Sequence, residues 1–226
     1  MKDEKFGWKL LRPILVVLAV LAFDQSLKFW VKLHFTYTES VKVFNWFYLY
    51  FIENEGMAFG MSLGGDSGKL MLSLFRLIAV FVIGYYLLKL VRQNAHPGFI
   101  TSIALIMAGA MGNILDSVFY GRLFSESTPD KIAKLFPPGG GYEAWLHGRV
   151  VDMLYFPVYE GFLPNWIPLW GGEYFIFFRP IFNIADASIS IGVILIILFQ
   201  KRFFKEKKEA VPPEMVAEPT EIKSQE

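Results

Sequence analysis

Four long apolar segments dominate this sequence and restrict what it can fold into. They cover residues 13–33, 70–91, 99–119 and 181–199. A helix needs about 20 apolar residues to cross the roughly 30 Å hydrocarbon core of a bilayer, and each segment has about that length. The composition agrees, because 54% of the 226 residues are hydrophobic. The sequence therefore predicts an α-helical membrane protein with four transmembrane helices.

The distribution of lysine and arginine predicts the orientation of these helices. Basic residues cluster before the first segment, between the second and third, and after the fourth. With four spans the three clusters share one side, and short basic loops favour the cytoplasm. Both termini are therefore expected in the cytoplasm, and residues 34–69 and 120–180 on the opposite face. The first segment begins like a signal peptide, but no clean small-residue cleavage site follows, so we expect a retained helix.

The segments outside the predicted spans differ in composition. Residues 41–60 are rich in aromatic and β-branched residues, which predicts strands packed at the membrane interface. Residues 118–147 contain prolines and three consecutive glycines, which indicates a loop insertion. Residues 204–226 are charged and contain proline, which is typical of a disordered tail. We expect one membrane domain over residues 1–203, with a small β-rich region and the insertion on the extracytoplasmic side.

The composition argues against several classes of function. The net charge is only +1, and no basic patch alternates with aromatic residues, so nucleic-acid binding is not expected. The chain has no cysteine, which excludes disulfides and thiol nucleophiles. His34, His96 and His147 lack the spacing of metal ligands. Neither a metal nor another cofactor is expected.

Carboxylates inside or beside the apolar segments need an explanation. An aspartate at the centre of a membrane helix costs about 2.5–3.5 kcal/mol on insertion scales, so it usually has a partner or a function. Asp24 precedes Lys28 by one helical turn, and this spacing predicts a structural ion pair. Asp116 ends the third segment, on the same helical face as Asn113. The sequence leaves open whether Asp116 ties the helix end to a loop or takes part in catalysis.

Two further aspartates are candidates for catalysis. Asp186 begins the fourth segment and shares a helical face with Asn183 and Ser190, which predicts a polar stripe on an apolar helix. Asp152 lies in an apolar, β-branched segment. Two carboxylates that meet in a site of low dielectric constant share one proton, and such a pair can activate water while it polarises a carbonyl. The alternatives are a satisfied buried network at Asp186 and a solvent-facing strand residue at Asp152.

Five short blocks of sequence resemble those of the lipoprotein signal peptidase (signal peptidase II) family. Any one block is a weak signal, but their occurrence in the family's order on a four-span scaffold is specific. The blocks are DQSLKFW at 24–30, FIENEGMAFG at 51–60, GNILDS at 112–117, GRVVDM at 148–153 and FNIADASISIG at 182–192.

This resemblance implies an activity and its partners. It implies an aspartyl endopeptidase of the bacterial inner membrane, with its active site near the extracytoplasmic face. Such an enzyme removes the signal peptide from prolipoproteins and cuts before a cysteine that already carries diacylglycerol. The expected partners are the prolipoprotein and membrane lipid. Inhibition by globomycin is expected, and we expect a monomer.

The resemblance also assigns roles to individual residues. It implies that Asp152 and Asp186 are the catalytic pair. The residues expected at the substrate site are Asn54, Gly56, Asn113, Asn183 and Arg149, with Asn183 also supporting the pair. The residues expected to be structural are Asp24, Lys28 and Asp116.

Two features depart from the family's pattern. Ser117 stands where the family commonly has an arginine that contacts the substrate backbone, and Arg149 or Arg122 is a candidate to supply that charge. Residues 118–147 lengthen a connection that is usually short, and we expect them to form an outward lid or a partner surface. A small ion-coupled transporter and a non-enzymatic assembly factor are the alternative functions. Cleavage of a prolipoprotein would discriminate among the three.

Overall fold

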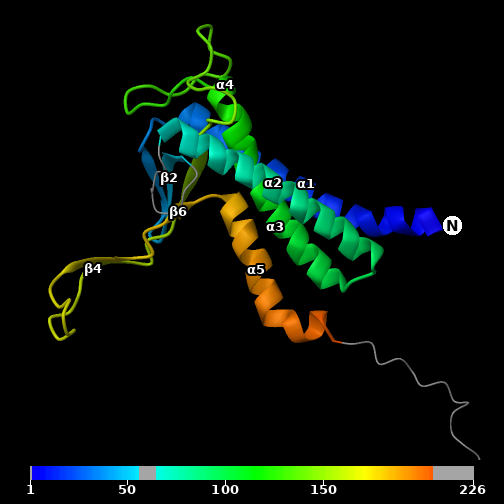
Figure 1. Ribbon diagram of the computed structural model, residues 1–226. Helices are drawn as coiled ribbons and strands as arrows, with labels where there is room; N and C mark the ends of the chain where they lie inside the picture. Colours follow the sequence, from blue (N-terminus) through cyan, green and yellow to red (C-terminus); the bar gives the residue numbers. More distant parts are fainter. Residues whose placement is uncertain (1, 56–64, 206–226) are drawn as a thin grey trace, which may run out of the picture.

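The computed structural model of the protein describes residues 2–55 and 65–205, and four long helices account for most of them (Figure 1). Each of the four is long and apolar enough to cross a membrane, which confirms the predicted number of spans within the described part of the chain. The helices are α1 (Lys2–His34), α2 (Gly65–Arg92), α3 (Pro97–Leu115) and α5 (Ile184–Phe203).

The helix ends differ from the predicted ends for local reasons. The last helix begins at Ile184 and not at residue 181, because Ile181–Phe182 form a short strand and Asn183 caps the helix. The Asn183 side chain accepts a hydrogen bond from the Asp186 N–H, and the Asp186 side chain accepts one from the Asn183 N–H, which together form a capping box. Helix α3 starts at Pro97, a favoured first helical residue because proline lacks an N–H.

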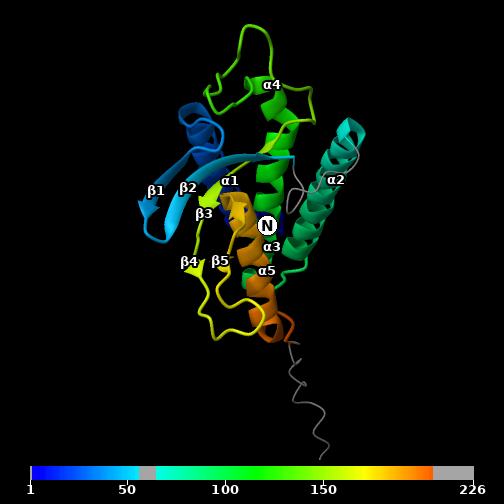
Figure 2. The same cartoon turned by 90° about the vertical axis from the view of Figure 1, so that its left-hand side faces the viewer.

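Beyond α3 the chain remains helical for two more short elements. These are the π-helical turn η2 (Asp116–Tyr120) and α4 (Gly121–Leu123), so the third apolar helical stretch reaches Leu123. The predicted insertion therefore begins as helix, and residues 124–147 form the loop. Two isolated β-bridges, Phe124 with Leu135 and Thr128 with Lys131, organise that loop. Figure 2 shows it beyond the end of α3, at the top of the view.

Helix α3 packs closely against α1 and α5 because its contact face carries small residues. A Cβ atom added to Gly109 would lie 2.2 Å from the Ala185 carbonyl oxygen of α5. One added to Gly112 would lie 2.8 Å from the Asp24 carboxylate of α1. Neither distance leaves room for a side chain, so glycine is required at both positions. Small residues at these positions let the backbones of neighbouring membrane helices approach closely.

A four-stranded antiparallel sheet covers one end of the helix bundle (Figure 1). Its strands are β1 (Ser40–Phe44), β2 (Phe47–Asn54), β3 (Val150–Tyr155) and β6 (Ile181–Phe182), in the order β1-β2-β3-β6. Strands β1 and β2 lie in the segment predicted to form strands, except that β1 begins one residue earlier, at Ser40. A separate hairpin, β4 (Tyr159–Phe162) and β5 (Tyr174–Phe177), extends from the sheet. The sheet brings β3 to the ends of α3 and α5, and five of the six residues of β3 are buried there.

Candidate active site

Asp152 and Asp186 come together from a strand and a helix end. Asp152 lies on β3 opposite Ile52 of β2, and only 3% of it is exposed. Asp186 lies in the first turn of α5, where the capping box with Asn183 fixes its side chain. The negative charge of Asp186 helps to raise the pKa of Asp152. The sequence identified both residues, and the fold places them in one site.

Two asparagine side chains link the carboxylates. Asn183 Nδ2 donates to Asp152 Oδ1 over 2.7 Å, and Asn113 Nδ2 donates to Asp186 Oδ1 over 2.7 Å. Asn183 Nδ2 also lies 3.1 Å from Asn113 Oδ1, so the two amides are connected to each other. Amide donors stabilise a charged carboxylate, while their rigidity fixes its orientation. The site therefore holds two carboxylates in defined positions.

The environment of Asp152 favours its protonated form. Burial raises the pKa of Asp152, the nearby charge of Asp186 raises it further, and the result is a pKa of about 7. The charge of Lys28 and the amides of Asn54 and Asn183 act in the opposite direction. Near neutral pH the pair can therefore hold one proton, which is the state that a carboxylate dyad needs in order to activate water.

The carboxylates expected to be structural surround one buried lysine. Lys28 Nζ lies 3.0 Å from Asp24 Oδ2, the predicted i,i+4 pair, and 2.8 Å from Asp116 Oδ2. It also donates to Asn113 Oδ1 over 3.0 Å. The side chains of all three charged residues are fully buried. This ion triad connects α1 to the end of α3 and to the amides of the site.

The acidic members of the triad also hold the backbone beside each candidate catalytic residue. Asp24 Oδ1 accepts from the N–H of Ala185, the residue before Asp186, over 2.9 Å. Asp116 Oδ2 accepts from the N–H of Val151, the residue before Asp152, over 3.1 Å. The triad therefore holds both β3 and the start of α5 in place, which is how it can act as a structural group.

The remaining expected site residues lie at different distances from the pair. Asn54 Nδ2 approaches Asp152 Oδ2 at 3.4 Å. Gly56 lies outside the described residues. Among the described residues, the guanidinium of Arg149 forms ion pairs with Glu53 at 3.5 Å and with Glu126 at 3.3 Å, and not with the carboxylate pair. Ser117, which stands where the resemblance leads us to expect an arginine, donates to the Asn113 carbonyl over 3.1 Å.

Sequence reasoning missed Gln25, which joins several parts of the site. Its Nε2 donates to Asp116 Oδ1 over 2.9 Å and to the Gly112 carbonyl over 3.2 Å. Its Oε1 accepts from the Tyr120 hydroxyl over 3.1 Å. Gln25 belongs to the first of the five blocks, and that membership was the only signal available in the sequence.

A second buried ionic cluster was also missed. Lys32 is fully buried at the end of α1 and forms an ion pair with Glu53, the residue before Asn54 on β2. Lys32 Nζ also donates to Ser127 of the insertion over 3.1 Å. The Tyr142 ring lies beside both Lys32 and Arg149, at 5.1 and 5.2 Å. This cluster fastens the insertion to the strand that supplies Asn54.

Arg76 is another residue that the sequence analysis did not single out. It lies inside the second apolar segment, on α2, and is partly buried. The carboxylates whose charges act on it include Asp186 and Asp152. An arginine within an apolar helix is a signal in itself, because such residues usually face a polar site. Arg76 therefore contributes positive potential to the region of the pair.

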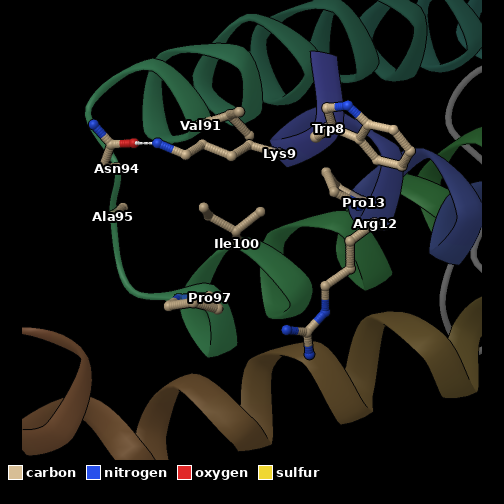
Figure 3. A pocket seen from close by; sticks show the side chains of 9 residues that line it. All are labelled: Trp8, Lys9, Arg12, Pro13, Val91, Asn94, Ala95, Pro97 and Ile100. Atoms are coloured by element: carbon tan, nitrogen blue, oxygen red, sulfur yellow. Dashed lines mark hydrogen bonds between the residues drawn. The ribbon is translucent and has the colours of Figure 1, made fainter. Parts of the chain in front are cut away.

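The other end of the bundle holds a cavity away from the carboxylate pair. Within residues 2–55 and 65–205, no group of three or more histidine, aspartate or glutamate side chains is placed to hold a metal ion. A cavity of about 580 Å³ lies where the first turns of α1 meet the connection between α2 and α3 (Figure 3). Lys9 hydrogen-bonds to Asn94 there, and none of the candidate site residues lines it.

Four membrane-spanning helices with a linked carboxylate pair at one end define a class of protein, a membrane enzyme suited to aspartic peptidase chemistry. Comparison with known proteins agrees with this class. The sequence profile of the family described as Signal peptidase (SPase) II matches residues 16–202. The chain belongs to this family and is a lipoprotein-processing protease of the signal peptidase II type.

Relatives and solved structures support this membership. A lipoprotein signal peptidase of Porphyromonas gingivalis is 52% identical over 188 residues, which cover 83% of this chain and 81% of that protein. One of Amoebophilus asiaticus is 35% identical, with 81% of this chain and 75% of the relative covered. A structure titled as a bacterial membrane enzyme superposes with a TM-score of 0.55 at 26% identity, covering 88% of this chain and 94% of the other.

Asn183 both caps α5 and donates to Asp152, which leads to a prediction that separates helix capping from support of the carboxylate pair. Serine can cap the helix as asparagine does, but its shorter side chain cannot reach Asp152. We expect Asn183→Ser to keep the melting temperature near that of the wild type and to lower the cleavage rate about 10²-fold. Asn183→Ala should lower both the melting temperature and the cleavage rate, and loss of the cap should reduce the free energy of unfolding by about 1 kcal/mol. Equal cleavage by the serine variant and the wild type would contradict a role for Asn183 at the pair.

Proposed function

We propose that this chain is an aspartyl endopeptidase that removes the signal peptide from diacylglyceryl-modified bacterial prolipoproteins. The cut falls on the N-terminal side of the lipidated cysteine, and Asp152 and Asp186 are the catalytic pair. The observation that supports this assignment most directly is the link between the two carboxylates through Asn183 and Asn113, together with the raised pKa of Asp152.

The mechanism follows from one proton shared by two carboxylates. The ionised carboxylate accepts a proton from a water molecule, whose oxygen attacks the scissile carbonyl carbon. The protonated carboxyl donates its proton to the carbonyl oxygen, which gives a neutral tetrahedral intermediate. Collapse of this intermediate breaks the C–N bond: the carboxyl that took the proton from water gives it to the leaving nitrogen, and a hydroxyl of the intermediate returns a proton to the other carboxylate, which restores the pair. The OH of the water molecule thus ends on the new carboxyl group and its other hydrogen on the new amino group. No metal or nucleotide is needed.

The substrate backbone is held by polar side chains around the pair. Asn54 and Asn113 each donate to a catalytic carboxylate and belong to different elements, β2 and α3, so they flank the pair. We assign substrate contacts to these two residues, to Gly56 and to Asn183. Arg149 is 26% exposed and joins this set, with its ion pairs to Glu53 and Glu126 setting its position.

The position of the site within the bundle fits a substrate that is anchored in lipid. The pair lies where α5 begins and η2 follows α3, at the end of the spans that faces away from both described termini. With the termini in the cytoplasm of the bacterial inner membrane, the site lies near the extracytoplasmic face. The signal-peptide helix then enters between spans while the diacylglycerol chains stay in the bilayer. We further propose that the enzyme acts as a monomer and binds globomycin at this site.

Cleavage of a purified substrate tests the proposed function. The full chain is reconstituted in lipid nanodiscs with a diacylglyceryl-modified prolipoprotein, and the released signal peptide is measured by mass spectrometry. A matched substrate with serine in place of the lipidated cysteine serves as the control. We expect cleavage of the modified substrate only, at the bond before the cysteine, and its inhibition by globomycin. Absence of cleavage, or equal cleavage of the unmodified substrate, would contradict the proposal.

The raised pKa of Asp152 predicts how pH affects stability. Its ordinary value is 3.8 and the folded protein raises it to about 7, so between these values the native state retains a proton that the unfolded chain has lost. The stability that this carboxyl contributes is therefore fully present below the ordinary value and is lost as the pH rises through about 7. Each pKa unit corresponds to about 1.4 kcal/mol, so the loss reaches up to about 4 kcal/mol.

Unfolding of the purified chain in detergent at several pH values measures this effect. The Asp152→Asn variant is the control, because its amide does not titrate. We expect the wild type to lose stability relative to this variant as the pH rises from acidic to neutral. A constant difference between the two proteins over that range would show that the pKa of Asp152 is not raised.

A further inference from the structure

The β4–β5 hairpin exposes an unusual number of large apolar side chains. Its connecting loop carries Trp166, Leu169 and Trp170, which are 79%, 90% and 60% exposed. Surface apolar residues are normally scattered, and a contiguous exposed group indicates a surface that binds something. The other large exposed apolar residues of the hairpin and its flanks are Val158, Tyr159, Phe162, Tyr174, Phe175, Phe177 and Phe178.

The register of the hairpin sorts its side chains onto two different faces. Tyr159 pairs with Phe177 and Gly161 with Phe175, so one face is formed by aromatic rings and a glycine. On the opposite face the Tyr174 hydroxyl hydrogen-bonds to Glu160. One face of the hairpin thus carries no charged residue, while the other carries Glu160 beside Phe162 and Ile176. Such a division suits an element that lies between water and an apolar medium.

The hairpin leads directly into the start of a transmembrane helix. Strand β5 ends at Phe177, and α5 begins only seven positions later, at Ile184. Figure 1 shows the hairpin extending from the sheet at the lower left of the view, away from the helix bundle. The lipid-facing surface of the spans and the apolar surface of the hairpin therefore meet at the same end of the molecule.

Aromatic contacts continue this surface towards the first hairpin of the sheet. Phe178 lies 6.0 Å from Phe182, Phe182 lies 5.6 Å from Phe156, and Phe156 stacks on Trp46 at 6.0 Å. Trp46 is itself exposed, in the turn between β1 and β2. Tryptophan and tyrosine concentrate at membrane interfaces, where their rings reach the headgroup region. The residues thus form one continuous aromatic band.

We propose that the β4–β5 hairpin is a membrane-surface anchor that inserts its tip into the headgroup region of the leaflet nearest the carboxylate pair. The occupant of its apolar surface is lipid. Residues 157–180 contain only Glu160, Glu173 and Arg179 as charged residues, so burial of apolar area drives the contact and anionic lipid is not required. The anchor fixes the depth of β6 and of the Asn183 cap, and thereby the depth of the pair.

The absence of cysteine from the chain permits a direct test. A Leu169→Cys variant of the full chain is labelled with an environment-sensitive fluorophore and reconstituted in phosphatidylcholine nanodiscs. Quenching by lipids that carry a nitroxide near the headgroup is compared with quenching by aqueous iodide. Gly139→Cys is the matched control, because Gly139 lies in the exposed insertion loop and no atom lies within 4 Å of a Cβ added there.

We expect the lipid nitroxide to quench the label at position 169 several-fold more than the label at position 139, with the reverse order for iodide. Adding Trp166→Asp and Trp170→Asp to the Leu169→Cys variant should reduce the lipid quenching several-fold. Equal quenching of the two labels would overturn the proposal, as would lipid quenching unaffected by the aspartates. Disulfide cross-linking between two copies through position 169, without lipid quenching, would assign the surface to a second copy and also overturn it.

Discussion

Replacement of either candidate catalytic aspartate by asparagine is expected to abolish cleavage while the fold is retained. Asparagine has almost the same shape as aspartate, but it neither shares a proton nor accepts one from water. General acid–base catalysis by one positioned group contributes about 10²–10⁴-fold, and members of a catalytic unit lose most of the activity together. We expect Asp152→Asn and Asp186→Asn each to lower the cleavage rate of the lipid-modified prolipoprotein by at least about 10³-fold. Mass spectrometry of the released signal peptide measures the rate.

A matched substitution on the surface controls for the general effect of removing a carboxylate. Asp130 lies exposed in the insertion, and Asp130→Asn should cleave at the wild-type rate. The double variant Asp152→Asn/Asp186→Asn should be no slower than either single variant, because the two carboxylates act as a unit. Normal cleavage by either single variant, with an unchanged melting temperature, would remove that residue from the catalytic pair.

Hydropathy predicted the helices because the bilayer imposes a simple requirement on length and composition. The four apolar segments became α1, α2, α3 and α5. The exact start of α5 was not predictable from hydropathy, since Ile181 and Phe182 are as apolar as the helix that follows. It depends on Asn183, whose side chain caps the helix while its amide reaches Asp152. One residue thus sets both the helix boundary and the geometry of the pair.

The polar network of the site was only partly predictable. The pair Asp24 and Lys28 follows from helical spacing, because residues four positions apart share a face. The contact of Lys28 with Asp116 joins residues 88 positions apart, and the burial of Lys32 beside Glu53 joins α1 to β2. No local periodicity encodes such contacts. They depend on how the sheet closes over the bundle, which only the tertiary structure shows.

The ion triad has the largest expected effect on stability. Lys28 is the counter-charge of both Asp24 and Asp116, and all three side chains are fully buried. Removing one partner of a buried ion pair typically costs about 3–5 kcal/mol, because an uncompensated charge remains in a medium of low dielectric constant. We expect Lys28→Met to reduce the free energy of unfolding by about this amount, measured by thermal unfolding in detergent. Cleavage should fall too, since Asp24 and Asp116 hold the N–H groups of Ala185 and Val151.

Two further variants distinguish loss of charge compensation from loss of packing. Asp24→Asn and Asp116→Asn, added to Lys28→Met, remove both stranded charges but keep oxygen atoms that accept from Ala185 and Val151. We expect this triple variant to recover most of the stability, because replacing a whole buried ionic group is often close to neutral. Glu126→Gln, which breaks a pair whose acid is 58% exposed, should cost less than about 1 kcal/mol. If Lys28→Met were as stable as Glu126→Gln, the triad would contribute no more than a surface ion pair, and the positions of Val151 and Ala185 would have to depend on the close packing around Gly112 instead.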